Sequence, residues 1–183
     1  MANIDELSRY ISDEMRRNVR SGEAKQIAVL RKQSFTHPVA LAAWARLVDY
    51  GERWDHKDKI LKRFGPWSTD LPTKHDYFLD VWSNIHYGYI GLSVGFDEGL
   101  LKLGAGVAQF KQDGLVETFG SQCRATAFEL ACFPALDHPH DQAAIQLGFD
   151  LWKAKGLQLT SMDVTSMVRS RRATLNTRRS KSS

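Results

Sequence analysis

Residues 76–95 carry acidic, amide and phenolic groups within an otherwise apolar, helix-like segment. Residues four apart share one face of a helix, and this spacing joins Asp76, Asp80, Asn84 and Gly88. Tyr87 lies beside that face. Apolar surroundings raise the pKa of a carboxyl group, which suits a general acid, and Asp80 is the first candidate for that role.

A second carboxyl group near Asp80 would allow glycoside hydrolysis. The two groups lie about 5 Å apart in retaining enzymes and roughly 6.5–9.5 Å apart in inverting ones. Asp76, one turn earlier, or Asp141, from a later helix, could supply the partner. Asn84 and Tyr87 would then hold sugar hydroxyl or N-acetyl groups. Aromatic faces for stacking on sugars are offered by Trp54, Trp67 and Trp82.

A nuclease is the alternative chemistry. His86 or His56 would act as general acid or base in a metal-independent RNase, and Lys57 would stabilise the charge on phosphorus. Carboxylates repel phosphates unless a metal intervenes, so a Mg²⁺-dependent nuclease would instead use Asp76, Asp80 and Asp141.

The same residues also have structural explanations. Small residues on one stripe, such as Gly88 and Gly91, let a second helix approach closely, and a partner protein could also dock there. On an ideal helix His86 points away from Asp80, as a core histidine would. Trp54 could pack in the core. Asp137 and Asp141 could cap or favour a helix start.

Three motifs, taken together, carry a family resemblance. They are WDHK at 54–57, D-x3-N-x-H-Y-G-Y-x-G at 80–91 and D-x-P-x-D-x-A-x-I-x2-G at 137–148. The chain resembles the polymorphic toxin type 44 domain family over about residues 3–156. This resemblance implies a bacterial toxin domain, delivered into competing cells by a secretion machinery and neutralised by a cognate immunity protein. The motif positions are occupied by Asp80, Asn84, His86, Tyr87, Gly88, Gly91, Asp137 and Asp141.

The candidate site follows from these arguments. The predicted catalytic residues are Asp80, His86, Asp141 and Asp76. The predicted substrate-binding residues are Asn84, Tyr87, Gly88, Gly91, Trp54, His56, Lys57 and Asp137. We expect no metal and no cofactor, with a cell-wall polymer as substrate and nucleic acid as the alternative.

Helical periodicity dominates the chain and predicts a mostly α, compact, single-domain helical bundle. The expected helices cover residues 4–20, 22–33, 38–51, 55–64, 76–95, 98–112 and 139–155. Residues 65–75 are expected to form a loop, and residues 113–136 are ambiguous.

Charge divides the chain unevenly. Residues 166–183 hold six Lys or Arg and no acid, whereas the remainder holds 19 Lys or Arg against 21 Asp or Glu. We therefore expect a toxin domain over 3–160 and a basic, disordered tail over 161–183, either solvated or acting as an electrostatic tether.

Targeting signals are not evident. The chain shows neither a signal peptide nor an apolar run of membrane-spanning length, and its two cysteines read as ordinary thiols. We expect production in the bacterial cytoplasm and export without a cleaved signal peptide into a target cell. Its periplasm is favoured as the place of action, with its cytoplasm as the alternative.

Overall fold

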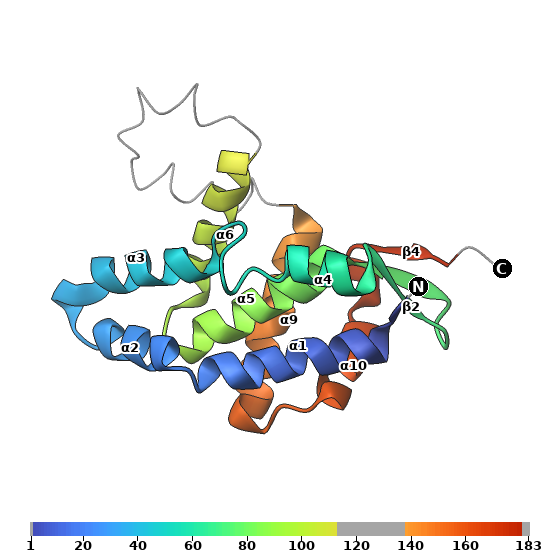
Figure 1. Ribbon diagram of the computed structural model, residues 1–183, viewed down its shortest axis with the longest axis horizontal. Coiled ribbons are helices and arrows are strands. Elements are labelled where there is room, and N and C mark those ends of the chain that lie inside the picture. Colours follow the sequence, from blue (N-terminus) through green and yellow to red (C-terminus); the bar gives the residue numbers. More distant parts are fainter. Residues whose placement is uncertain (1, 113–137, 181–183) are drawn as a thin grey trace.

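The computed structural model describes residues 2–112 and 138–180, with side chains described outside 106–112 and Ser34. The predicted mostly α, single-domain fold is confirmed (Figure 1). Its α-helices are α1 (Ile4–Val19), α2 (Gly22–Arg31), α3 (His37–Val48), α4 (Lys57–Phe64), α5 (Leu79–Ser93), α6 (Glu98–Gln112), α9 (Pro139–Lys155) and α10 (Ser161–Ser170).

Local signals in the sequence explain several helix ends. The Asn3 side chain accepts a hydrogen bond from the Asp5 amide at 3.0 Å and so begins α1. Asp97 likewise accepts from the Leu100 amide at 2.8 Å at the start of α6. Gly156 ends α9 with φ +49°, a conformation that glycine adopts without steric cost.

A small sheet was not predicted. Its strands are β1 (Ala2–Asn3), β2 (Trp67–Asp70), β3 (His75–Phe78) and β4 (Thr177–Arg179), in the order β1-β2-β3-β4. β1 pairs parallel with β2, and the other pairs are antiparallel. The expectations of a loop over 65–75 and of a helix beginning at Asp76 are therefore wrong. Each strand has four residues or fewer, which is too short for alternation to reveal it.

The prediction of a disordered tail is wrong for residues 161–180. α10 packs against α1, and β4 adds an edge to the sheet. The tail's arginines pair with fully buried carboxylates. Arg169 donates two-pronged hydrogen bonds to Asp70 at 2.8 and 3.1 Å, and Arg178 Nε lies 3.2 Å from Asp76 Oδ2. These cations balance acids of the sheet and belong to the same packed unit.

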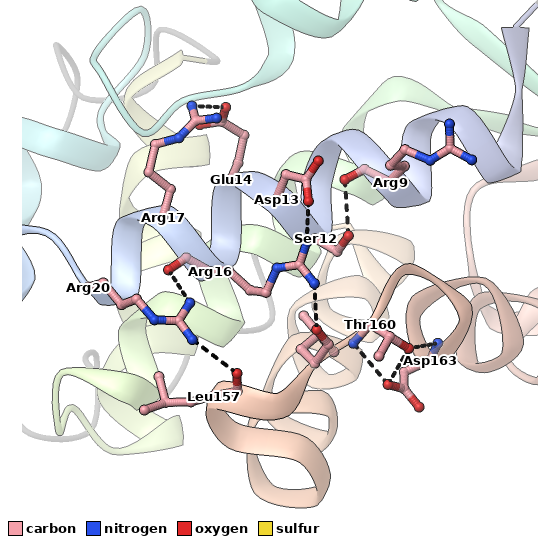
Figure 2. Close-up of polar contacts among 11 residues, drawn as sticks. Arg9, Ser12, Asp13, Glu14, Arg16, Arg17, Arg20, Leu157, Thr160 and Asp163 are labelled. Carbon is pink, nitrogen blue, oxygen red and sulfur yellow. Dashed lines mark hydrogen bonds and ion pairs between the residues drawn. The ribbon is translucent and has the colours of Figure 1, made fainter.

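α1 also holds the segment between α9 and α10, as Figure 2 shows. Arg20 donates to the Leu157 carbonyl at 3.3 Å, and Arg16 donates to the Leu159 carbonyl at 3.2 Å. The next helix begins with a capping box between Thr160 and Asp163. The C-terminal segment is thus fixed from its first residues.

The centre of the fold is the crossing of α5 and α9, which pack closely against each other (Figure 1). A Cβ built on Gly88 would lie 2.2 Å from the Ile145 carbonyl oxygen, and one on Gly148 would lie 2.2 Å from the Ile85 carbonyl oxygen. Only glycine at these two positions allows the backbones to come so near. This close approach determines which side chains of the two helices can meet.

Candidate active site

A cavity of about 380 Å³ lies between α3, α5, α6 and α9. Its wall is mainly apolar and aromatic, including Trp44, Val48, Trp54, Tyr87, Phe96 and Leu101. Polar side chains interrupt that wall at Asp49, Asp55, Lys57, Ser83, Asn84 and Asp141. A concave, mostly apolar site with a few polar groups is typical of ligand-binding pockets.

The polar stripe of α5 faces the first turns of α9. The Asn84 amide donates to Asp141 Oδ1 at 2.7 Å, and Asp141 lies near enough to Asp80 to lower the pKa of the Asp80 carboxyl group. One turn further along, Gly88 contacts the backbone of Ile145. The predicted common face of Asp80, Asn84 and Gly88 is therefore confirmed, and α9 covers it.

Burial raises the pKa of Asp80 above its usual range. A hydrogen bond from Asn176, the charge of Lys57, the backbone amide of Val81 and the nearby Asp141 partly oppose this rise. Asp80 Oδ1 is buried, and it has no hydrogen-bond partner among the described residues. A raised pKa favours the protonated form of Asp80, which is the form that a hydrogen bond from Asp80 to a neighbouring carboxylate requires.

Asp76 does not share this face, because it lies on β3 and not on a helix. Burial pushes its pKa up, but hydrogen bonds from Ser180, Thr69 and Arg178 outweigh burial and hold the pKa below its usual range. Its carboxylate is thus engaged with the C-terminal segment. Of the two predicted partners, the structure brings Asp141 to Asp80.

The two motif histidines lie in the core, outside the cavity wall. His56 and His86 are fully buried, and their rings stack edge to face with centroids 4.2 Å apart. Tyr10 contacts His56 Nδ1 and Asn18 contacts His86 Nε2, each at 2.9 Å. Burial lowers the pKa of His56 to about 3 and that of His86 well below its usual value. Both rings are therefore neutral at pH 7.

Other predicted binding residues separate into two groups. Trp54, Lys57 and Tyr87 line the cavity, although Trp54 is largely buried against Trp44 and the Tyr87 hydroxyl donates to the Leu101 carbonyl at 2.9 Å. Gly88 and Gly91 are buried and do not line the cavity. A Cβ on Gly91 would lie 2.5 Å from a Leu101 methyl group, so the glycine at this position lets Leu101 of α6 pack closely against α5.

The two remaining tryptophans proposed for stacking on sugars do not line the cavity. Trp82 is fully buried, and Trp67 lies beneath the Arg178 guanidinium, 3.9 Å from its ring centroid. Asp137 lies outside the described residues. Within the described residues, no group of three or more His, Cys, Asp or Glu side chains is arranged to hold a metal ion.

Sequence reasoning missed two contributors to the site. Trp44 of α3 forms part of the cavity wall and contacts Trp54, Tyr87 and Phe96. Asn176, in the segment predicted to be disordered, donates to Asp80 Oδ2 at 3.1 Å. Neither residue stands in a recognisable motif, and only the tertiary fold brings them to α5.

The family model described as bacterial toxin 44 matches residues 43–154. The chain therefore belongs to the bacterial toxin 44 family, and as a toxin of this class it implies an immunity partner. No curated protein and no solved structure matches it significantly.

None of the helices over residues 2–112 and 138–180 is both long and apolar enough to cross a membrane.

Proposed function

We propose that this toxin domain hydrolyses the glycan strands of peptidoglycan through the Asp80–Asp141 carboxyl pair. The observation that carries the proposal is the placement of the two groups on the two central helices, where Asn84 of the Asp80 helix bonds to Asp141 and Asp141 lines a cavity. A paired acid and carboxylate are the groups that glycoside hydrolysis requires.

In the proposed reaction, Asp80 donates a proton to the glycosidic oxygen as general acid. Asp141, which accepts a hydrogen bond from Asn84, is the ionised partner at the cavity wall and takes a proton from the water that attacks the anomeric carbon as the glycosidic bond breaks. A hydrogen-bonded pair is closer than the about 5 Å of a retaining enzyme. Entry of the sugar must therefore separate the two carboxyl groups, with Asp141 following the substrate into the cavity.

The cavity wall suits a sugar ring with a small apolar substituent. Trp44 and Trp54 provide aromatic surface, and Asn84 and Lys57 provide hydrogen-bond donors. Peptidoglycan sugars carry N-acetyl groups that combine an apolar methyl with a polar amide. Tyr87 remains a proposed binding residue because it also lines this cavity.

The nuclease alternatives receive less support from the geometry. His56 and His86 are neutral and fully buried, whereas Asp80 is only partly buried, so the histidines are less accessible to a polymer. The acidic trio proposed for Mg²⁺ is divided, because Asp76 bonds to the C-terminal segment. The non-enzymatic alternative required a free glycine groove, and α9 occupies the groove at Gly88.

The proposed place of action is the periplasm of a target bacterium, reached through a delivery machinery and blocked there by the immunity protein. The test is expression in the cytoplasm against expression with an added export signal, with growth and cell shape followed together. Lysis or rounding only after export supports wall hydrolysis. Arrest only in the cytoplasm contradicts it, and RNA and DNA integrity would then be measured.

A further inference from the structure

The C-terminal strap, which we define as residues 171–180, returns to the start of α5. Leu175 is buried at its base, and the Phe78 amide donates to the Asn176 carbonyl at 3.1 Å. The Asn176 side chain in turn donates to Asp80 Oδ2 at 3.1 Å. The family model matches residues 43–154, so this contact comes from outside the matched region.

The strap is fixed on both sides of Asn176. On one side, Arg171 forms an ion pair with Asp150 of α9 at 2.7 Å. On the other side, β4 pairs with β3, and Arg178 and Ser180 both contact the buried Asp76 carboxylate. These anchors hold the Asn176 amide in a defined position, and a defined donor can orient a carboxyl group.

We propose that Asn176 is a positioning residue, whose side-chain hydrogen bond holds the Asp80 carboxyl group in its orientation near Asp141. The contribution of Asn176 to catalysis rests on the proposed function. The effect of Asn176 on the Asp80 carboxyl group does not depend on that function. The functional toxin unit then extends beyond the family match to the strap. A chain ending at residue 154 would lack this donor.

The charged groups that influence Asp80 define what loss of Asn176 would do. Asp141 approaches from α9, and Lys57 contributes its charge from α4. Asn176 is the uncharged donor from the strap, and its hydrogen bond lowers the pKa of Asp80. Without this hydrogen bond, less opposes the rise that burial causes in the pKa of Asp80. Asp80 therefore keeps its proton to higher pH.

The test is a carboxyl-carbon NMR titration of Asp80 in the full chain. Asn176→Ala removes the donor, and Asn176→Asp places a second acid at the same distance. The matched control is Arg179→Ala, since Arg179 is exposed on the same strap and has no side-chain hydrogen bond or ion pair among the described residues. We expect Asp80 to titrate at higher pH in both Asn176 variants, more so in Asn176→Asp, and unchanged in the control.

Activity on purified cell walls separates this inference from the proposed function. We expect Asn176→Ala to lower kcat about tenfold with little change in KM and to move the alkaline limit of activity upward. An unchanged Asp80 titration in folded Asn176 variants overturns the positioning inference. A shifted titration with no wall cleavage by the unmodified chain supports that inference and overturns the proposed function.

Discussion

The closest contact between α5 and α9 gives a quantitative test of how the carboxyl pair is assembled. Gly88→Ala would place a Cβ 2.2 Å from the Ile145 carbonyl oxygen, whereas ordinary contact begins at 3.4 Å. The obstacle is backbone and cannot rotate away. The two helices must therefore separate locally by roughly 1 Å, or the helices must bend to a similar extent.

Two opposing effects determine how much Gly88→Ala changes the free energy of unfolding. Overpacking a well-filled core costs about 1–3 kcal/mol, and a backbone obstacle places this site near the upper end. Alanine recovers about 1 kcal/mol of helix propensity over glycine. We expect a net loss of about 2 kcal/mol in the free energy of unfolding, which in a chain of this size lowers Tm by about 4–8 °C.

Urea and thermal unfolding followed by circular dichroism would measure this loss. Gly22→Ala is the matched control, because a Cβ at this helical glycine would meet nothing within 4 Å. The control is expected to be as stable as the unmodified chain, or slightly more stable. If Gly88→Ala also keeps its full stability, the close contact and the carboxyl pairing built on it are refuted.

Two further predictions concern buried charge. Arg169→Ala leaves the fully buried Asp70 carboxylate without its two-pronged partner, and we expect a loss of about 2–3 kcal/mol in urea unfolding, against no loss in the exposed Arg179→Ala. His56 has a folded-state pKa of about 3, below its unfolded value, so its contribution to stability is present above about pH 6.5 and is lost as pH falls toward 3. Ring-nitrogen NMR should therefore find His56 neutral at pH 5, and titration near pH 6.5 would contradict its buried placement.

The helical face of α5 could be predicted from the sequence, because residues four apart share a face whatever surrounds the helix. For the second carboxyl group of the pair, the sequence left two candidates, Asp76 and Asp141. Periodicity within one helix carries no information about which residue of a second helix approaches it. Gly88 and Gly148 allow the two helices to approach closely. As glycines they predict a close approach, but they do not identify the helix that packs there.

The errors also have physical reasons. His75–Phe78 continues directly into α5, so the apolar pattern runs across the junction and placed Asp76 on the helix. The prediction of a disordered tail is wrong because the tail has the composition of a solvated segment but is held by distant partners. Its order depends on Asp70 and Asp76, buried acids 99 and 102 residues away from Arg169 and Arg178. Composition within a segment cannot reveal such distant partners.

Release of new reducing ends from purified peptidoglycan tests the central claim most directly. Wild type would be compared with Asp80→Asn and Asp141→Asn, which preserve side-chain shape, after unfolding curves confirm that both variants are folded. The account predicts that wild type releases reducing ends and that each variant loses at least about a hundredfold in rate. Absence of reducing ends with wild type, or full activity in either folded variant, would contradict it.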